Sequence, residues 1–269
     1  RFTHRNNQIT IYSDELIQSG DIFDVTVYYR GRPTGEGGFA SFEFGYHSTG
    51  PIIATLSEPY GARTWWPCKD DPKDKADSVD IIVTVPDTLI VASNGTLISD
   101  DLNDDGTKTY FWAERYPITT YLVSLAISNY SIFKDHYRYS ATDSMEVIYY
   151  VYPLHLQAAK TDFSVTTDMI AFYSTIFGEY PFINEKYGMA EFQWGGAMEH
   201  QTCTSYGTGL IQGNNRYDSI VAHELAHQWF GNLITMKKWS HIWLNEGFAS
   251  YAEALWFEHQ YGKQFYHDY

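Results

Sequence analysis

The sequence predicts an α+β protein, in which an antiparallel, β-rich first half is followed by a mainly helical second half. Before residue 152, short runs rich in β-branched and aromatic residues alternate with turn signals, which is typical of antiparallel strands. After Pro153, apolar residues recur at the spacing of a helix. We therefore predict an amino-terminal β domain over residues 1–152 and a second domain over residues 153–269.

Several segments of the first half are predicted to form strands. Apolar and polar residues alternate from Val25 to Tyr29, and the β-branched run that begins at Val79 stops at Pro86. Asn94-Gly95 predicts a two-residue hairpin between two short apolar runs. The other predicted strands, with a second hairpin turn at 104–106, cover 109–112, 121–133 and 145–152.

The second half is predicted to contain three helices and one strand. Each predicted helix ends at a glycine, which commonly terminates helices. The predicted helices are 155–177, 218–230 and 243–261. A short apolar run, 189–194, predicts a strand immediately before Gly195 and Gly196.

The charge balance argues against two classes of partner. The 269 residues include 18 Lys and Arg against 33 Asp and Glu, a formal net charge of −15. Nucleic acids and anionic membrane surfaces are bound by basic surfaces, so neither is a predicted partner. No stretch approaches the roughly 18 consecutive apolar residues of a membrane-spanning helix.

The compartment of the protein stays open on this evidence. Cys68 and Cys203 are far apart and form no CxxC pattern, so they are read as two independent apolar residues. Asn94 and Asn129 begin glycosylation sequons, although the first is already explained as a turn. The sequons and the acidic charge favour an exported protein without deciding the matter.

His223-Glu224-Leu225-Ala226-His227 is an HExxH motif inside the second predicted helix. Side chains four residues apart share one helix face, with Cβ atoms about 5–6 Å apart, so both imidazoles can reach one Zn²⁺ ion. Glu224 is placed to hydrogen-bond a water molecule on the metal and to accept its proton. The motif is short and also occurs in helices that bind nothing, so a third ligand is required.

Glu246 is the predicted third ligand. It follows His227 after eighteen residues, which allows the chain to turn and lay the third helix against the second. The alternative is an exposed helix charge, and apolar Trp243, Leu244 and Phe248 around Glu246 argue against it. Two imidazoles and one carboxylate leave the fourth position of a zinc ion for water, as in catalytic zinc sites.

Glu253 is a candidate support for the metal site. It lies seven residues after Glu246, and therefore on the same face of the third predicted helix. A carboxylate there can accept a hydrogen bond from the outer nitrogen of a zinc-bound histidine. A solvated helix charge is the alternative, and the residues alone do not decide between the two.

Four separated motifs resemble the M1 family of zinc aminopeptidases. HELAHQWFGN at 223–232 and WLNEGFA at 243–249 are similar to its zinc-binding segments, and GAMEH at 196–200 resembles its exopeptidase motif GAMEN. The segment 58–68 resembles part of its amino domain. The resemblance covers most of the chain and implies an antiparallel β saddle or sandwich, followed by the first half of a thermolysin-like catalytic domain.

The resemblance also implies a reaction and its metal. His223, His227 and Glu246 match the family's zinc ligands, for one Zn²⁺ per chain, and Glu224 matches its general base. The expected activity is hydrolysis of the amino-terminal residue from peptides.

A peptide substrate with a free amino terminus is the implied partner. Glu199 and Glu58 match the residues that bind the α-amine, and two carboxylates beside a metal would neutralise an ammonium group while rejecting a blocked terminus. The small residues around Gly196 would let a peptide pair as an added strand, with an ordinary loop as the alternative. The other predicted substrate-binding residues form one segment, which comprises Gly195, Gly196, Ala197, Met198 and His200.

Two departures from the family pattern affect the expected activity. His200 stands where GAMEN has Asn, and because histidine titrates near pH 6.5, we expect an altered pH profile or substrate affinity between pH 5 and 8. The family's catalytic Tyr, which stabilises the oxyanion, falls beyond Tyr269, so we expect a piece of a longer enzyme. Loss of one oxyanion donor costs about 10²–10³ in rate, so the piece alone is expected to hydrolyse poorly.

Two other functions remain open. A thermolysin-type zinc endopeptidase shares HExxH and the downstream Glu but has no use for Glu199 and Glu58, and it would accept an acetylated amino terminus. A non-catalytic binding module of the same fold would be expected to lose metal ligands, whereas here the ligands and Glu224 are all present. Zinc content and hydrolysis of free and blocked substrates distinguish the three functions.

Overall fold

The computed structural model describes residues 1–33 and 41–264, and the chain forms two compact units, Arg1–Gly31 and Arg32–Tyr269. The first unit contains an antiparallel hairpin of β1 (Phe2–Arg5) and β2 (Gln8–Ile11). The run that begins at Val25 has no regular secondary structure, so the strand predicted there is wrong. Alternation alone supplies no partner for a strand's backbone, and a strand is stable only beside another.

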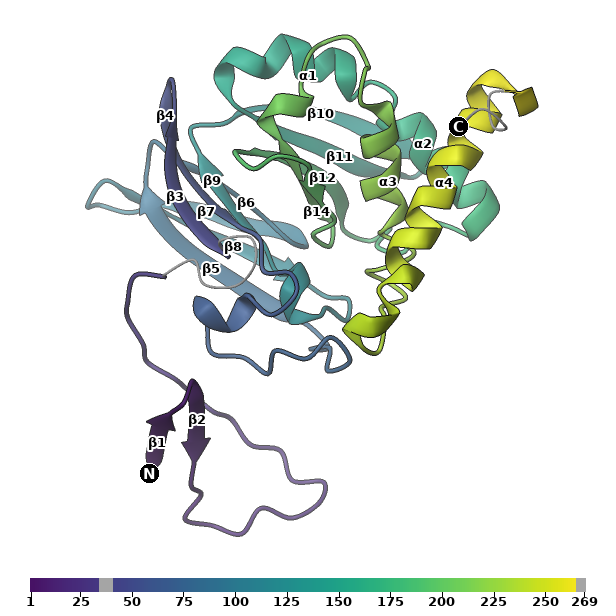
Figure 1. Ribbon diagram of the computed structural model, residues 1–269. Helices are drawn as coiled ribbons and strands as arrows, with labels where there is room; N and C mark the ends of the chain where they lie inside the picture. Colours follow the sequence, from purple (N-terminus) through teal and green to yellow (C-terminus); the bar gives the residue numbers. More distant parts are fainter. Residues whose placement is uncertain (34–40, 265–269) are drawn as a thin grey trace. The chain divides into compact units, whose positions relative to one another are not determined.

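The second unit begins with two antiparallel sheets (Figure 1). One has four strands in the order β3-β4-β9-β6, and the other has three in the order β5-β8-β7. Apolar side chains from both sheets share one core, in which Val91 and Trp112 are fully buried. The strands are β3 (Phe42–His47), β4 (Gly50–Thr55), β5 (Val79–Pro86), β6 (Ile90–Ser93), β7 (Thr96–Leu102), β8 (Thr107–Glu114) and β9 (Leu125–Ser128).

The dipeptide Asn94-Gly95 forms a corner between these sheets, so the hairpin predicted there is wrong. The flanking strands β6 and β7 belong to different sheets. The buried Asn94 side chain donates to the carbonyl oxygens of Leu122 and Gln201 at 2.9 and 2.6 Å and accepts from the Ser124 N–H at 2.7 Å. Gly95 has φ = 73°, which favours glycine. These tertiary contacts outweigh the local hairpin signal.

A mixed sheet of five strands follows, in the order β10-β11-β12-β14-β13. The inner pairs β11-β12 and β12-β14 are parallel, whereas β10 and β13 are antiparallel edge strands. The predicted boundary at residue 152 falls between β11 and β12, so the sheet combines strands from both sides of it. The strands are β10 (Ser131–Arg138), β11 (Ser144–Val151), β12 (Lys186–Phe192), β13 (Ala197–Met198) and β14 (Cys203–Gly207).

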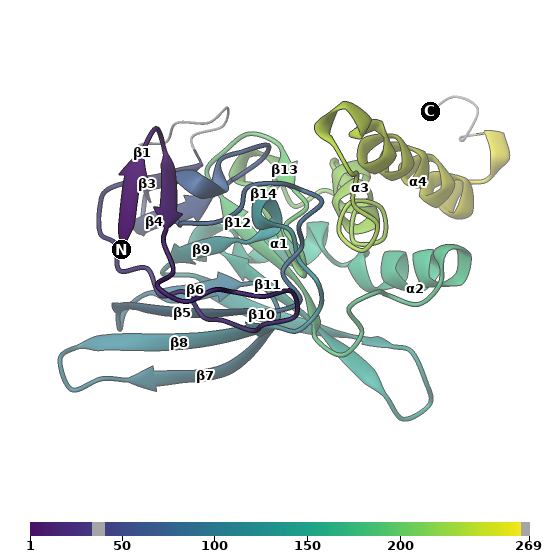
Figure 2. The same cartoon turned by 90° about the horizontal axis from the view of Figure 1, so that it is seen from below.

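The described residues include four α-helices, which are α1 (Leu156–Asp162), α2 (Thr166–Phe177), α3 (Asp218–Ala226) and α4 (Trp243–Tyr261). Helices α2, α3 and α4 lie together beside the five-stranded sheet, and Figure 2 shows α3 and α4 side by side with α2 below them. The Tyr173 hydroxyl of α2 lies 3.3 Å from the carbonyl oxygen of Ala222 on α3 and 3.0 Å from that of Ala252 on α4. This buried contact fixes the packing of the two helices that carry the candidate site.

Two helix predictions require correction. The helix predicted over 155–177 is split into α1 and α2. At the break, the buried carboxylate of Asp162, the last residue of α1, accepts four backbone N–H groups of the loop 212–215, at 2.7–2.8 Å. Helix α3 ends at Ala226 rather than at 230, with His227 as its C-cap. No helix in the described part of the chain is long and apolar enough to cross a membrane. Both cysteines are free thiols.

Candidate functional site

Helices α3 and α4 bring the three predicted metal ligands together. The Nε2 atoms of His223 and His227 lie 3.0 Å apart. The Oε2 atom of Glu246, in the first turn of α4, lies 3.3 Å from the first of these nitrogens and 3.6 Å from the second. His227 is fully buried, whereas the side chains of His223 and Glu246 are partly exposed.

The outer nitrogens of both imidazoles define which atoms face the centre of the group. Nδ1 of His227 lies 2.9 Å from the carbonyl oxygen of Phe230, which can only accept, so this nitrogen carries a hydrogen. Nδ1 of His223 lies 2.6 Å from a carboxylate oxygen of Glu253 and also donates. In the neutral tautomers, both Nε2 lone pairs therefore point toward the carboxylate of Glu246.

Three acceptors that converge in this way fit a metal ion. A tetrahedral zinc ion with bonds of about 2.0–2.1 Å holds neighbouring ligand atoms about 3.3 Å apart, which is close to the three separations here. The backbone also makes room for the ring: Gly231 has φ = 139°, and a Cβ on it would lie 3.1 Å from Nδ1 of His227. The residues present therefore fit a zinc ion held by two imidazoles and one carboxylate.

The protonation of the same three residues shows that the site favours positive charge. Burial lowers the pKa of His223, but hydrogen bonds to Glu246 and Glu253 outweigh it and raise the pKa to about 10. Burial likewise opposes charge on His227, while Glu199 and Glu246 raise its pKa to about 9. Burial raises the pKa of Glu246, yet its hydrogen bonds to both imidazoles hold that pKa well below the usual range.

Two further carboxylates lie beside the ligands. Ligand atoms of Glu199, Glu224 and His227 all lie within 4.8 Å of one another. Glu199 and Glu224 are buried, and each has one oxygen without a hydrogen-bond partner among the described residues. Burial is the main cause that raises the pKa of each carboxyl above its ordinary value. Each of these oxygens can therefore accept a hydrogen bond from an additional polar or cationic group.

Glu58 completes the carboxylate cluster from the β-rich part of the unit. Burial raises its pKa, and so does the negative charge of Glu199 and Glu246 nearby. The charges that act on Glu58 thus include those of Glu199 and His227, which are also neighbours of one another. A cation placed between Glu58 and Glu199 would relieve their repulsion.

The predicted substrate segment leads from β12 into the edge strand β13. Gly195 and Gly196 are exposed, and Gly196 has φ = 85°. Ala197 and Met198 form β13 and pair with Tyr206 and Ser205 of β14, while the opposite edge of β13 carries no described strand. An extended chain can therefore add along that edge.

His200 does not behave as expected from its sequence. It is fully buried, and its Nδ1 lies 2.8 Å from the Ser205 hydroxyl. Burial lowers the pKa of His200 to about 3, so the side chain stays neutral between pH 5 and 8. Protonation of His200 in that range, on which the expected change of pH profile depended, is therefore not supported.

Several supporting residues were not identified from the sequence. The Asn232 amide donates to the carbonyl oxygen of Glu199 at 2.7 Å, and the Gln228 side chain accepts from the Thr202 N–H at 3.0 Å. Gln228 and Asn232 both lie in the HELAHQWFGN segment, within five residues of His227, so this position was the available signal. Asn245 lies inside the WLNEGFA motif, whereas Tyr121, which it contacts from 124 residues away, carries no local signal.

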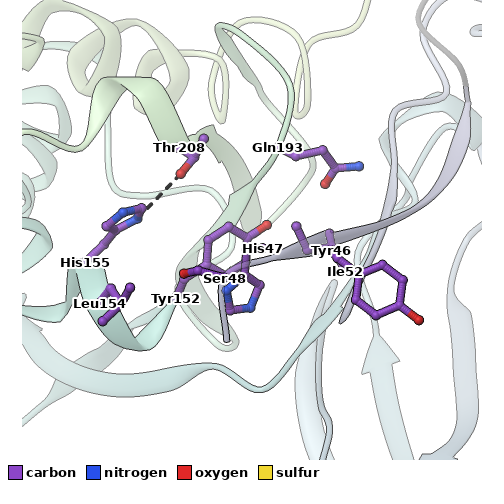
Figure 3. Close-up of a pocket in the computed structure, with 9 residues that line it drawn as sticks. All are labelled: Tyr46, His47, Ser48, Ile52, Tyr152, Leu154, His155, Gln193 and Thr208. Atoms are coloured by element: carbon purple, nitrogen blue, oxygen red, sulfur yellow. Dashed lines mark hydrogen bonds between the residues drawn. The ribbon is translucent and has the colours of Figure 1, made fainter. Parts of the chain in front are cut away.

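A separate cavity of about 280 Å³ lies away from these residues (Figure 3). His155 on its wall lies 2.6 Å from the buried carboxylate of Glu191, to which the Thr208 hydroxyl also donates. His47 stacks on Tyr152 with ring centroids 4.1 Å apart. None of the nine residues drawn in Figure 3 is a predicted site residue.

Comparison with known families matches two models to the chain. The model of the peptidase M1 N-terminal domain matches residues 1–122, and that of the peptidase family M1 domain matches residues 161–269. Glutamyl aminopeptidase of Rattus norvegicus is 31% identical over 91% of this chain and 27% of its own length. Leucyl aminopeptidase of Saccharolobus solfataricus is 32% identical over 79% of this chain and 27% of its own length.

Solved structures give the same relationship. The M1 zinc metallopeptidase of Deinococcus radiodurans is 29% identical, with a TM-score of 0.65 over 78% of this chain and 47% of that one. A mutant of that enzyme, bound to a Tyr-Ser-Ala substrate, is 30% identical with a TM-score of 0.65 over 79% of this chain and 47% of that one. The chain thus spans about a quarter of the length of these curated relatives and about half of the solved chains.

Proposed function

We propose that this chain, which belongs to peptidase family M1, forms the zinc-binding part of an aminopeptidase that removes the amino-terminal residue of peptides. The observation that carries the proposal is the convergence of His223, His227 and Glu246 beside three further carboxylates. A metal ligand set and an ammonium-binding cluster in contact are what this reaction requires.

One zinc ion per chain would be held by Nε2 of His223, Nε2 of His227 and the carboxylate of Glu246. Bound there, zinc supplies Lewis-acid chemistry, which makes water nucleophilic near neutral pH and polarises a carbonyl group. Glu253 and the carbonyl oxygen of Phe230 hold the two imidazoles in the tautomer that presents Nε2.

Glu224 is the proposed general base. Its buried carboxylate has an oxygen without a partner among the described residues, and it lies beside His227. It would accept the proton of the attacking water and pass it to the nitrogen of the leaving amine. Burial raises the pKa of Glu224, which brings the group closer to the pH at which proton transfer in both directions is efficient.

Glu199 and Glu58 are the proposed binding groups for the α-amine. An ammonium group between them would form charge-assisted hydrogen bonds and offset both the burial and the repulsion from Glu199 that raise the pKa of Glu58. An acetylated terminus carries no positive charge, so both carboxylates would be buried against a neutral amide. This requirement favours an aminopeptidase over an endopeptidase.

The substrate backbone is proposed to pair with β13. Ala197 and Met198 would offer the free edge of that strand, with Gly195 and Gly196 leaving space at its start. His200 would act only by packing and by its contact with Ser205.

We also propose that the chain divides into a β domain over residues 1–152 and a catalytic domain over residues 153–269.

The first test is metal content in the full-length protein. Wild type should contain about one zinc ion per chain, and Glu246→Gln should lose most of it, because an amide oxygen is a weaker zinc ligand than a carboxylate. Glu258→Gln, on the same helix but outside the ligand group, is the control and should keep its zinc. Equal zinc in wild type and Glu246→Gln would contradict the ligand assignment.

The second test is the choice of substrate. The full-length protein should hydrolyse an amino-acid p-nitroanilide, and the N-acetylated compound should not react measurably. Glu224→Gln should retain zinc and lose about 10²–10⁴ in kcat, the usual contribution of a general base. Comparable hydrolysis of the acetylated compound would favour the endopeptidase, and zinc binding without any hydrolysis would favour the binding module.

A further inference from the structure

A buried hydrogen bond connects the β-rich part of the unit to the helix that carries Glu246. Nδ2 of Asn245 lies 3.2 Å from the hydroxyl of Tyr121, which belongs to the 3₁₀ segment Thr120–Leu122. Asn245 is fully buried, and Tyr121 is only 1% exposed. This contact therefore excludes water and joins segments 124 residues apart.

Asn245 lies in the first turn of α4, next to the proposed zinc ligand Glu246. It immediately precedes Glu246, and the backbone N–H groups of both residues donate to the carbonyl oxygen of Ile242 in the first turn. Later along α4, Glu253 contacts His223, and Phe248 stacks on Phe230 with centroids 4.7 Å apart. Those later contacts hold α4 to α3 and to the segment that follows it, beyond Glu246.

The start of α4 is held differently. The Asn245 amide donates to Tyr121, and its other nearby acceptor is the thioether sulfur of Met236 at 3.3 Å, which accepts only weakly. The ring of Tyr121 packs edge-on against Trp239, which precedes α4, with centroids 5.1 Å apart. Hydroxyl and ring together fix the first turn.

We propose that Tyr121 is a positioning residue for the metal site, which acts through Asn245 to hold the carboxylate of Glu246 at ligating distance from the two imidazoles. The inference rests on the proposed function, since it assumes that Glu246 binds zinc. Tyr121 touches neither the metal ligands nor the substrate groups by any hydrogen bond described here, so its effect is indirect. The hydroxyl, rather than the ring, is the group that the proposal requires.

The electrostatic surroundings agree with this placement. The pKa of Tyr121 is raised well above its ordinary value, by burial and then by the negative charge of Glu199, Glu58 and Glu246. The hydroxyl therefore stays protonated, and it lies close enough to the carboxylate cluster to respond to it.

Tyr121→Phe in the full-length protein tests the proposal. This change keeps the ring against Trp239 and leaves the Asn245 amide with only the sulfur acceptor. We expect zinc affinity, measured by competition with a chromogenic chelator, to fall about 10-fold, the lower end of the effect of losing a group bonded directly to a zinc ligand, because Tyr121 acts through Asn245. The visible absorption spectrum of the Co²⁺-substituted protein should shift as well, since it reports ligand geometry.

Tyr130→Phe is the matched control. It also removes a buried tyrosine hydroxyl, which donates to the carbonyl oxygen of Glu191 at 2.8 Å away from the ligand group. It should lose stability in a similar way, with unchanged zinc affinity and Co²⁺ spectrum. Should Tyr121→Phe fail to fold, Asn245→Ser removes the same hydrogen bond from the other side and should give the same loss of affinity.

The outcomes separate this inference from the proposed function. If Tyr121→Phe and Asn245→Ser bind zinc as tightly as wild type, with the same Co²⁺ spectrum, while Glu246→Gln loses zinc, the positioning role is wrong and the zinc site stands. If Glu246→Gln binds zinc as wild type does, the proposed function itself fails. Equal losses in Tyr121→Phe and Tyr130→Phe would also overturn the positioning role, because they would indicate a general effect of stability.

Discussion

His200 shows how far burial can change the chemistry of a single residue. As a free side chain it would titrate near neutral pH, but it is fully buried and burial lowers its pKa to about 3. In the unfolded chain the same imidazole binds a proton below its ordinary value of about 6.5. The unfolded state therefore binds more protons than the folded state at acidic pH, and stability must fall as pH decreases.

We expect His200→Asn to reduce this sensitivity to acid. Between pH 7 and 5, the single histidine should cost the folded state about 2 kcal/mol, because each unit below its unfolded pKa contributes about 1.4 kcal/mol. Urea unfolding of metal-free wild type and variant at both pH values measures the difference, and the other histidines cancel in the comparison. An equal loss of stability in the two proteins would show that His200 is protonated in the folded state.

The residues of the metal site differ in how far the sequence could predict them. His223, Glu224 and His227 form a local motif whose spacing alone places them on one helix face, and Glu246 was predicted from its apolar setting and the length of chain between. Tyr121 could not be predicted in this way, because its role depends on a tertiary contact across 124 residues. Local patterns identify ligands, whereas the groups that support them depend on the fold.

The packing of helix α3 against helix α4 determines the geometry of the metal site. Neither helix carries the full ligand set, so the relative register of the two decides whether the ligands meet. Glu253 fixes this register two turns after Glu246, through its contact of 2.6 Å with Nδ1 of His223. The sequence left Glu253 undecided between this contact and a solvated charge.

Glu253→Gln should weaken zinc binding about 10- to 100-fold in the full-length protein. The amide still reaches His223, but it removes the negative charge that favours the Nδ1–H tautomer and makes Nε2 a strong ligand. Competition with a chelator measures the affinity, and kcat at saturating zinc should change much less. Unaltered affinity, with Glu258→Gln measured beside it, would mean that the contact is only structural.

Local sequence preference predicts some of the helices and strands correctly and fails for others. Strand β5 and helix α4 lie where they were predicted, because a β-branched run before proline and an apolar helical period before glycine are decided by local preference. The helix predicted over 155–177 is interrupted after Asp162, whose carboxylate binds a distant loop, and Asn94-Gly95 turns between sheets where Asn94 binds distant backbone groups. Buried polar side chains with long-range partners are what the local pattern missed.

In the molecule as a whole, Asn94 is a junction, a residue that connects three sheets. Its side chain binds backbone groups next to β9 and just before β14, while its own backbone connects β6 to β7. Three sheets therefore depend on one buried amide. The same burial removes the side-chain nitrogen from solvent, so the sequon that begins at Asn94 is not accessible in the folded protein.

Asn94→Ala should destabilise the protein by about 3 kcal/mol or more, because it leaves three buried backbone groups without a partner, each worth about 1–3 kcal/mol when unpaired. Asn103→Ala is the control, since the Asn103 amide binds two hydroxyls in an exposed turn and should cost less than about 1 kcal/mol. Thermal or urea unfolding measures both. Similar losses in the two variants would contradict the role of Asn94 as a junction.

The mixed sheet also limits how this molecule can be divided. Five residues of β11, from Glu146 to Tyr150, pair with β12 across the point where the sequence suggests a cut. A gene fusion that transplanted only the helical half would leave the parallel edge of β12 bare, with its amides and carbonyls free to recruit other chains. A soluble fusion protein that carries the zinc-binding helices therefore has to start before Ser131, so that it also includes β10 and β11.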